Sequence, residues 1–557
     1  MSAMQNTEAN NENWKSTACM LCSIGCAIEV QVDGQHLKKV RGDKSAASSK
    51  GYLCQKAARL DHYQNHSERL TKPLRKKTDG SFEEVEWDEI INEIAGKMRG
   101  IRSRHGGHAF AYYGGGGQGN HLGGTYSSAL TAALGTPYIY TALAQEKTGD
   151  FWINGKLFGR QSCFAVEGME HADYAIVLGA NPWAAHGIPK TRDLLKQYKK
   201  DPARTMVVID PRLSETAKMA DIHLPVKPGK DAFLLSAIIA IILKDGLEDK
   251  AFIAKHTHNF ESVKAQFLSV PIEQYIKTAG LDFDIVKKVA IDFAKADTAT
   301  VRADLGIQHS LHSTLNSYLE KLLFLITGNF NKKGGNHLIA QFAPLIGHSK
   351  EPEEGGVVTR VTGMKGISKI FPPNILPQEI NSDHPDRIRV LVVDSANPGL
   401  SAADTAAYRL AFDKLELSVV IDVAMTETAR MADYILPAPT QFEKTECAFF
   451  TFGFPTSYFH LRKPVLEVTA GVSAEKQGDT LPEPEIYRRL VVAMGEIPDR
   501  FPKLEQIAKL DRKFQFSRLY PIALAATLKA NPKWMPYVPL ILYATLGKAL
   551  PENMASA

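Results

Sequence analysis

Four cysteines near the start of the chain have the spacing of a metal centre. They follow the pattern C-x2-C-x3-C-x27-C and are Cys19, Cys22, Cys26 and Cys54. Only two other cysteines occur in the 557 residues. Thiolates are favoured ligands of iron–sulfur clusters and of structural zinc, and the three cysteines of the first run must converge on one centre. Cys54 returns from a later loop to complete a four-cysteine site.

The spacing favours an iron–sulfur cluster over zinc. Zinc sites usually consist of two C-x2-C pairs, whereas this chain has one C-x2-C-x3-C run and one distant cysteine. That pattern suits a cubane, which needs ligands on three adjacent corners. Structural zinc is the alternative, and four unrelated core cysteines are the explanation without a function.

A weak internal repeat is the second pattern with chemical meaning. Residues 174–182 (YAIVLGANP) precede 206–226 (MVVIDPRLSETAKMADIHLPV), and residues 390–398 (VLVVDSANP) precede 418–438 (SVVIDVAMTETARMADYILPA). Four residues recur in register, as the pairs Asp210 and Asp422, Thr216 and Thr428, Asp221 and Asp433, and Pro225 and Pro437. The repeat predicts two related structural units.

Each copy of the repeat contains a strand that ends in an Asn-Pro loop. Such a loop lies at the carboxyl edge of a parallel sheet, where backbone N–H groups and helix N-termini bind phosphate. An aspartate that ends the next strand can accept hydrogen bonds from ribose or base. Two nucleotide-like sites are therefore expected, with a duplicated fold that binds no ligand as the alternative. The chain contains no GxGxxG or P-loop, so ordinary dinucleotide and ATP sites have little support.

The elements around these motifs indicate a small cysteine-bearing domain and two larger ones. Residues 27–32 and 37–40 are short strand-like runs, a helix follows from Val85, and residues 114–124 form a glycine-dense loop. Beyond Tyr174, apolar strand runs alternate with amphipathic helices, which predicts doubly wound parallel sheets covered on both faces. The expected fold class is α/β, with an N-terminal iron-sulfur domain and two pseudo-symmetric parallel-sheet domains.

Composition indicates an ordinary globular protein, with 44% hydrophobic and 23% charged residues. The net charge of +5 comes from interspersed charges of both signs, so we expect a solvated surface and no nucleic-acid binding. The apolar stretches 232–243 and 537–546 are too short to span a membrane and are expected to be buried helices. No export signal is visible, so we expect a cytoplasmic protein.

In the combination of these motifs the chain resembles the molybdopterin oxidoreductase family, which includes formate dehydrogenases, nitrate reductases and dimethyl sulfoxide reductase. The likeness runs from about Cys19 to about Glu443. It implies that the four cysteines bind a 4Fe-4S cluster and that Lys56, two residues after Cys54, lies between cluster and pterin. It also implies two molybdopterin guanine dinucleotides, one at each pseudo-symmetric half, and a pterin-bound molybdenum or tungsten.

The resemblance assigns cofactor-binding roles residue by residue. For one dinucleotide the positions are Gly179, Asn181, Pro182, Asp210, Arg212, Gly229 and Asp231. For the second they are Asn397, Pro398, Asp422, Thr426, Thr428 and Asp433. The segment LGIQHSLHS looks like the family's Gly-x-Gln-His loop and adds Gly306, Gln308 and His309. For the single histidines His121, His186 and His348, an ordinary hydrogen-bonded role is the simpler explanation.

The resemblance also divides the chain. It implies an iron–sulfur cluster domain at 1–72, a first, discontinuous dinucleotide-binding domain at 73–141 and 342–445, and a second at 142–341. A mostly helical segment follows at 446–557. Family members normally continue into a domain that covers both dinucleotides, and here the sequence ends at Ala557, so we expect a shortened form or a fragment.

One loop departs from the family pattern. Formate dehydrogenases and periplasmic nitrate reductases supply a cysteine or selenocysteine to the metal from a loop that aligns near residues 144–149, where this chain reads AQEKTG. A thiolate from that loop is excluded. Glu146 is the candidate oxygen ligand, with an ordinary surface residue as the alternative, and Lys147 is a candidate for binding an anionic substrate or the metal-bound oxygen.

The function that we expect is therefore a two-electron oxidoreductase that acts on a small molecule and passes electrons singly through the cluster to a redox partner protein. Catalytic roles are expected for Glu146, Lys147 and Lys56. A metal-free electron-transfer or structural subunit of the same fold is the alternative. A formate dehydrogenase is a further one, weakened by the missing Cys-His pair.

Overall fold

The computed structural model describes residues 14–114, 120–341, 344, 346–350, 354–449, 458–466, 480–514 and 519–547. The chain divides into two compact units. Unit 1 comprises Met1–Gln145, Ser349–Phe449 and Phe459–Ala557, and unit 2 comprises Glu146–His348 and Phe450–Tyr458.

A three-stranded antiparallel sheet carries the cysteines in unit 1. It consists of β1 (Trp14–Ala18), β2 (Ala27–Asp33) and β3 (His36–Gly42), followed by a 3-10 helix η1 (Ala57–Arg59) and α1 (Leu60–Asn65). The predicted strand-like runs at 27–32 and 37–40 are confirmed. Ile28 and Val30 are fully buried, whereas Glu29 between them is only partly buried, as expected for a sheet with one face on a core.

A seven-stranded sheet forms the centre of unit 1. Its order is β5 (Phe82–Glu84), β4 (Leu74–Lys76), β16 (Tyr434–Pro437), β15 (Leu417–Asp422), β14 (Val390–Asp394), β6 (Phe110–Gly114) and β7 (Ile139–Tyr140). The strands from β16 to β7 are parallel, and β4 is antiparallel to β16. The buried strands are rich in Val, Ile and Leu, which is typical of a parallel sheet covered on both faces.

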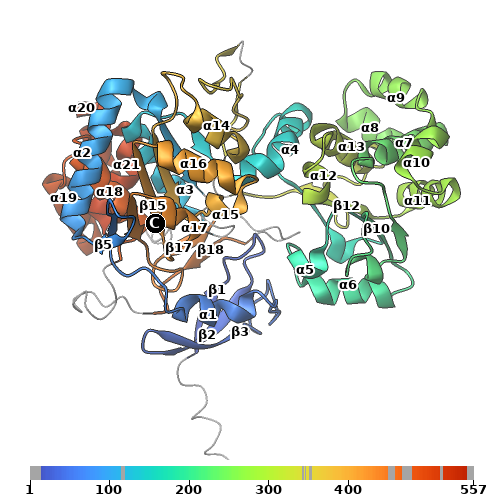
Figure 1. Cartoon of the computed structure of the whole chain (residues 1–557). Coiled ribbons are helices and arrows are strands. Elements are labelled where there is room, and N and C mark those ends of the chain that lie inside the picture. Colours follow the sequence, from blue (N-terminus) through green and yellow to red (C-terminus); the bar gives the residue numbers. More distant parts are fainter. Residues whose placement is uncertain are drawn as a thin grey trace, which may run out of the picture. The chain divides into compact units, whose positions relative to one another are not determined.

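Helices cover this sheet. On one side α14 (Leu376–Asn381) and α16 (Thr405–Lys414) pack together, and their residues share a core with β14 and β15. A second group consists of α2 (Trp87–His105), α3 (Leu122–Leu134), α18 (Glu483–Ala493), α19 (Pro502–Phe514), α20 (Leu519–Ala530), η8 (Pro532–Tyr537) and α21 (Val538–Leu546) (Figure 1). Two short helices, α15 (Pro398–Ser401) and α17 (Glu427–Met431), follow β14 and β15, and β17 (Glu446–Ala448) pairs with β18 (His460–Arg462).

Unit 2 contains a four-stranded sheet that is parallel throughout. Its order is β11 (Ile222–Leu224), β10 (Thr205–Ile209), β9 (Tyr174–Leu178) and β12 (Ala299–Ala303). Along β9, Ile176 belongs to one core cluster, and Ala175 and Val177 belong to another. This alternation means that the sheet is buried on both faces.

One face of this sheet is covered by α7 (Asp231–Lys244), whose residues 232–243 are almost entirely buried, as predicted. Around α7 lie α8 (Lys250–His256), α9 (Phe260–Leu268), α10 (Ile272–Ala279), α11 (Phe283–Lys295) and α13 (Ser313–Ile326) (Figure 1). The other face is covered by α6 (Thr191–Lys200). The remaining elements are α4 (Ala142–Phe158), α5 (Pro182–Ala185), α12 (Leu305–Gln308), and the antiparallel pair β8 (Ala165–Glu167) and β13 (Asn336–Leu338).

The two large sheets share a four-stranded order. In unit 2 it is β11-β10-β9-β12, and in unit 1 it is β16-β15-β14-β6. The repeated segments supply the first three strands of each set. The fourth comes from later in the chain in unit 2 and from earlier in unit 1, which a search for sequence repeats cannot detect. The predicted fold class, with two pseudo-symmetric parallel-sheet domains, is confirmed.

The structure locates the end of the glycine-dense loop and the border between the two units. Residues 115–119 of the predicted glycine-dense loop lie outside the described residues, and α3 begins at Leu122, before the predicted end of the loop at Gly124. The border between the two units lies inside α4, between Gln145 and Glu146. The residue boundaries of the predicted domains stay predictions.

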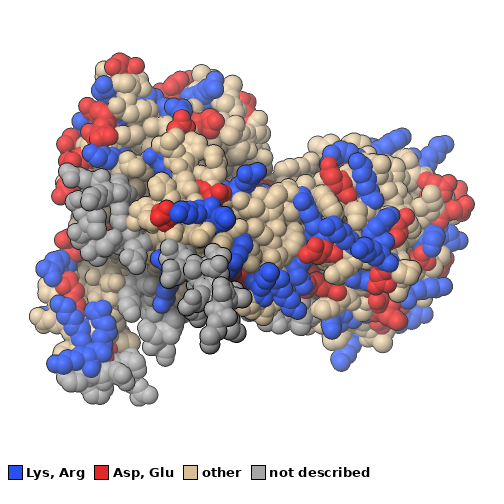
Figure 2. Space-filling view, turned by 90° about the horizontal axis from the view of Figure 1, so that it is seen from below, with Lys and Arg blue, Asp and Glu red and all other residues tan. Residues whose placement is uncertain are grey.

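Among the described residues, no helix is long and apolar enough to cross a membrane. Figure 2 shows Lys and Arg side chains interspersed with Asp and Glu over the face in view.

The second aspartate of each repeat anchors the strand before it. Asp433 Oδ2 accepts hydrogen bonds from the Ser418 backbone N–H (2.7 Å) and hydroxyl (2.8 Å), whereas Asp221 Oδ2 accepts one from the Met206 N–H (2.8 Å). Asp433 is partly buried and Asp221 is exposed.

We therefore expect Asp433→Ala to lower the free energy of unfolding by roughly 1.5–3 kcal/mol and Asp221→Ala to lower it less. Hydrogen exchange at the Ser418 and Met206 amides, followed by mass spectrometry, measures both effects locally. Equal acceleration in the two variants would contradict the expected difference.

Candidate functional site

Three of the four predicted cluster ligands lie in the loop between β1 and β2. The Cys19 N–H donates to the Cys26 carbonyl (2.8 Å), which closes the loop, and the Gly25 N–H donates to the Cys22 carbonyl (3.2 Å). Cys54 precedes η1 and, like Cys19, packs against the small core of this sheet. The backbone N–H of Leu21 points at Cys19 Sγ (3.5 Å) and that of Ala57 at Cys54 Sγ (3.4 Å).

Without a bound metal, the surroundings of this loop favour protonated thiols. Burial raises the pKa of the Cys19 thiol to about 12 and also raises the pKa of the Cys26 thiol. The neighbouring cysteines increase both pKa values further. A bound metal must therefore displace protons, and backbone N–H groups directed at sulfur stabilise the charge that results. Within the described residues, no three His, Cys, Asp or Glu side chains are arranged to hold a single metal ion. Lys56 follows Cys54 at an exposed position.

At the carboxyl edge of the unit 2 sheet, Asn181 shapes the Asn-Pro loop. Its Oδ1 accepts hydrogen bonds from the Thr216 hydroxyl (2.7 Å) and N–H (3.3 Å), and the Thr216 hydroxyl in turn accepts from the Trp183 N–H (3.1 Å). The Asn181 side-chain amide donates to Glu215 (2.8 Å). Pro182 begins α5, where its missing N–H is not needed.

Unit 1 repeats this arrangement. Asn397 Oδ1 accepts hydrogen bonds from the Thr428 hydroxyl (2.7 Å) and N–H (3.1 Å), and the hydroxyl accepts from the Gly399 N–H (3.0 Å). Pro398 begins α15. We call this contact, in both units, the Asn–Thr clasp. These hydrogen bonds hold the Asn-Pro loop in shape, and the cofactor-binding roles of its residues stay predictions.

Two predicted glycines meet beside the clasp of unit 2. The Gly306 N–H donates to the Gly179 carbonyl (2.9 Å), and a Cβ on Gly306 would lie only 2.6 Å from the Gly179 Cα. Gly179 also has a left-handed backbone (φ +57°). The equivalent residue in unit 1 is Ser395, with φ +52°, whose hydroxyl donates to Asp394 Oδ1 (2.8 Å). The structure therefore brings the loop after β9 and the predicted Gly-x-Gln-His loop together.

Carboxylates gather at the same edge in unit 2. Asp210 follows β10, and its Oδ1 accepts from the Arg212 N–H (2.8 Å). Asp231 is the buried first residue of α7, and burial, together with the charge of Asp210, raises its pKa. Gly229 has φ +73° with open space where a Cβ would lie. These residues offer acceptors for the N–H groups of a base beside a backbone that a ligand can approach.

In unit 1, Asp422 is the counterpart of Asp210, and Asp394 is an additional buried carboxylate whose counterpart in unit 2 is Leu178. Burial raises the pKa of Asp422 to about 6. Hydrogen bonds from the Val423 N–H (2.6 Å) and Ala424 N–H (3.3 Å) lower this pKa but do not cancel the effect of burial. Asp394 ends β14 and accepts hydrogen bonds from Tyr112 (2.9 Å) and Tyr487, and burial raises its pKa as well. Thr426 caps α17 by accepting from the Ala429 N–H, and Asp433 anchors β15, so both contribute to the shape of this edge.

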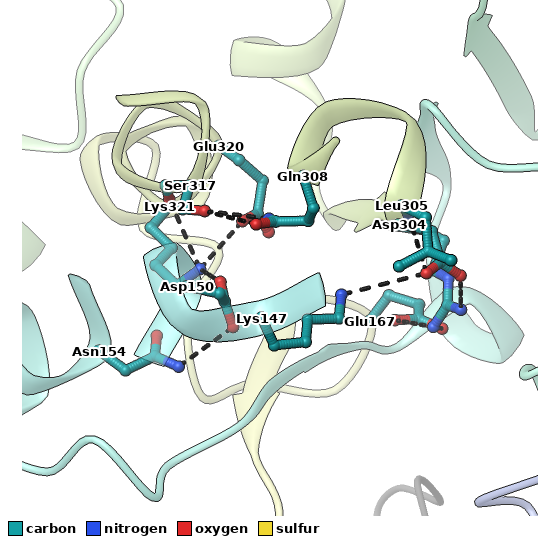
Figure 3. Close-up of polar contacts among 11 residues, drawn as sticks. Lys147, Asp150, Asn154, Glu167, Asp304, Leu305, Gln308, Ser317, Glu320 and Lys321 are labelled. Carbon is teal, nitrogen blue, oxygen red and sulfur yellow. Dashed lines mark hydrogen bonds and ion pairs between the residues drawn. The ribbon is translucent and has the colours of Figure 1, made fainter. Parts of the chain in front are cut away.

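Both catalytic candidates on α4 lie beside the loop after β12. Lys147 Nζ is 4.0 Å from Asp304 Oδ1, and Asp304 also pairs with the buried Arg302 (2.6 Å), which contacts Glu167 (3.2 Å) (Figure 3). Burial raises the pKa of Glu146, and the charges of Lys147 and His309 partly offset this. Asp304 caps α12, which contains Gly306 and Gln308. The structure thus places four sequence-predicted residues of unit 2 around one loop: Glu146, Lys147, Gln308 and His309.

A buried ion triad connects α4 to α13. Lys321 pairs with Asp150 and with Glu320 (3.0 Å), and only 2% of its side chain is exposed. The Gln308 side-chain amide donates to Ser317 Oγ (3.0 Å), one turn before Lys321 (Figure 3). Burial raises the pKa of Glu320, while Lys321 holds the pKa of Asp150 below its usual value despite burial. Removing one partner of such a group leaves a buried charge and is strongly destabilising.

Sequence reasoning missed these supporting charges. The residues are Asp150, Glu167, Arg302, Asp304, Glu320 and Lys321. The only available signal was the presence of ionisable residues in otherwise apolar segments, such as Glu320 and Lys321 within STLNSYLEKLLFLI. Of the single histidines, His121 accepts a hydrogen bond from the Phe449 N–H (2.7 Å), which is the ordinary role expected for it.

Comparisons with known proteins agree with this architecture. Residues 12–66 match the molybdopterin oxidoreductase Fe4S4 domain. Residues 69–468, well over half of the chain, match the molybdopterin oxidoreductase family. In the solved structure of acetylene hydratase from Pelobacter acetylenicus, a similar fold covers 86% of this chain and 69% of that chain, with a TM-score of 0.73 and 21% identity.

Curated relatives are similar over most of this chain. A probable oxidoreductase YyaE of Bacillus subtilis is 28% identical over 77% of the chain, and a nitrate reductase of Symbiobacterium thermophilum is 28% identical over 79%. An F420-dependent formate dehydrogenase subunit alpha of Methanocaldococcus jannaschii is 26% identical over 77%. The matches span only 63%, 62% and 64% of these relatives' lengths. On the family match, the chain belongs to the molybdopterin oxidoreductase family and contains its Fe4S4 domain.

Proposed function

We propose that this protein is a molybdenum or tungsten oxidoreductase that binds two molybdopterin guanine dinucleotides and one 4Fe-4S cluster. Its substrate is a small molecule, and its electrons leave singly through the cluster to a redox partner protein. A cytoplasmic location is part of the proposal, since thiols stay reduced in that compartment.

The observation that supports two dinucleotides is the duplicated strand edge. Each unit has an Asn–Thr clasp in the loop after a strand, which is β9 in unit 2 and β14 in unit 1. Each unit also has a carboxylate at the end of the next strand, Asp210 after β10 and Asp422 at the end of β15. Carboxyl edges of parallel sheets are where such ligands bind. The predicted contacts in unit 2 add Arg212, Gly229 and Asp231, and those in unit 1 add Thr426 and Asp433.

For the cluster, we propose Cys19, Cys22, Cys26 and Cys54 as its ligands. The support is their placement on one loop and one adjacent turn, with backbone N–H groups directed at two of the sulfurs. Lys56 would lie beside the path of electrons between cluster and pterin. Its ammonium favours the more negative, reduced cluster.

The metal supplies the two-electron chemistry, and the chain's own residues bind and orient the substrate near it. We propose that Lys147, fixed by Asp304, binds an anionic group of the substrate by a charge-assisted hydrogen bond. Glu146 is the proposed oxygen ligand, and Gln308 and His309 line the same loop. A formate dehydrogenase remains the weaker proposal, because the Cys-His pair of those enzymes is missing from residues 144–149.

Metal and nucleotide content test the proposal directly. Anaerobically purified protein from cells that make the cofactor should contain molybdenum or tungsten, about four iron atoms, and about two releasable guanosine monophosphates per chain. Elemental analysis and chromatography of the acid extract provide these ratios. Iron without molybdenum, tungsten or guanosine monophosphate would instead support the metal-free subunit.

Removing a cluster ligand gives the second test of this proposal. Cys54→Ser should lose or convert the cluster, because four thiolates complete the iron sites, whereas Cys163→Ser should retain it. Iron and sulfide content together with low-temperature paramagnetic resonance distinguish the two. An unchanged spectrum in Cys54→Ser would exclude Cys54 as a ligand.

The raised pKa of Asp422 predicts a pH-dependent cost in cofactor-free protein. Because folding favours the protonated carboxyl, its stabilising contribution is present below pH 3.8 and is lost as the pH rises through about 6. Asp422→Asn should therefore be more stable than the parent above pH 7, by on the order of 3 kcal/mol, and have no advantage near pH 4.

Thermal unfolding of both cofactor-free proteins between pH 4 and 8 measures this difference. In cofactor-loaded protein the preference should reverse, because the carboxylate then accepts hydrogen bonds from the ligand, and Asp422→Asn should release its dinucleotide more readily. A stability difference that does not change with pH would contradict the assignment of Asp422 as a buried, ligand-accepting carboxylate.

A further inference from the structure

A buried arginine lies beside the cysteine loop. Arg462 is the last residue of β18, and only 3% of it is exposed. Its guanidinium donates to Asn120 Oδ1 (2.7 Å) and makes a longer contact with Gln441 Oε1 (3.4 Å). A guanidinium stays charged at every physiological pH, so this is a permanent positive charge in the interior.

Three contacts connect this charge to the predicted cluster loop. The Asn120 side-chain amide donates to Met20 Sδ (3.4 Å), and Met20 directly follows Cys19. Strand β18 lies against β1, which leads into Cys19. Val465 and Leu466, shortly after Arg462, belong to the same core as Cys19. Arg462 is therefore fixed relative to the loop by backbone and side chain.

Two carboxylates and one cation lie near Arg462, and one of the carboxylates, Glu446, lies directly opposite it in the β17–β18 pair. Glu446, on the neighbouring strand β17, is buried and accepts a hydrogen bond from the Leu122 N–H (2.8 Å). Lys444 pairs with Glu483, both largely buried. Burial raises the pKa of Cys19, and Arg462 acts against this increase. Lys56, in contrast, is exposed, so water and salt screen its charge.

We propose that Arg462 sets the reduction potential of the 4Fe-4S cluster, acting as a fixed, buried positive charge that stabilises the reduced state. This inference rests on the proposed cluster ligation by the four cysteines. Reduction adds one electron, hence one negative charge, to a centre in a low-dielectric surrounding, where a nearby cation is worth much more than in water. Arg462 is a positioning residue as well, since its hydrogen bond to Asn120 fixes a side chain that contacts Met20 in the cysteine loop.

Replacing Arg462 tests the proposal. In Arg462→Met the cluster should be harder to reduce, with the ratio of reduced to oxidised cluster at a fixed potential falling on the order of tenfold, or about 59 mV for one electron. Arg462→Lys should keep most of the parental potential. The matched control is Arg41→Met, because Arg41 stacks on Trp14 (3.9 Å) and pairs with Glu29 in the same small domain but is half exposed.

The measurement is an anaerobic potentiometric titration of each full-length, cluster-containing protein, monitored by paramagnetic resonance. A second variant, Asn120→Asp, keeps Arg462 and places a carboxylate against it, so it should also make the cluster harder to reduce. It decides the matter if Arg462→Met fails to fold. A merely structural arginine would change yield or cluster content without moving the potential.

The outcomes separate the two proposals. A cluster signal in Arg462→Met or Asn120→Asp at the parental potential would overturn the role of Arg462 and leave the proposed function standing. Parent protein without a 4Fe-4S signal would overturn the proposed cluster itself. A potential that falls in Arg462→Met and Asn120→Asp, but not in Arg41→Met, supports the inference.

Discussion

The Asn–Thr clasp is the constraint on which both sheet edges depend. In these sheets a loop connects the carboxyl end of β9 to α5 and that of β14 to α15. The backbone N–H and C=O groups of such a loop need hydrogen-bond partners. Asn181 and Asn397 solve this identically, since each accepts two hydrogen bonds from the threonine that follows the next strand. The clasp ties neighbouring crossovers together, so the carboxylates that follow in sequence are presented at a defined edge.

The charged side chains near the two sheet edges have different kinds of partners. In unit 2, cations and carboxylates alternate from Glu167 through Arg302 and Asp304 to Lys147, so each of these four charges has a partner. In unit 1, Asp394 and Asp422 are stabilised mainly by hydroxyl and backbone donors. Hydrogen bonds from such donors favour the charged carboxylate, but burial outweighs them and raises the pKa of both groups. The two sheet edges therefore share a backbone frame but differ in the groups that surround their carboxylates.

The sequence predicted what is encoded locally. Cysteine spacing identified the loop between β1 and β2, and the repeat identified β9 to β11 and β14 to β16 because those strands are contiguous in each copy. It did not reveal that β6 and β12 are the fourth strands of the shared order, since they lie on opposite sides of their repeats in the chain. Nor did it reveal Lys321 or Arg462, because a buried charge is defined by partners far away in the chain, such as Asp150 and Asn120.

The contact between Gly179 and Gly306 determines how closely two segments of unit 2 can approach. Each glycine excludes a side chain on the other, because their backbones touch. A side chain at either position would meet the backbone of the other, so the two segments can approach this closely only while both residues are glycine. The spacing between the loop after β9 and helix α12 is thus set by the absence of two side chains.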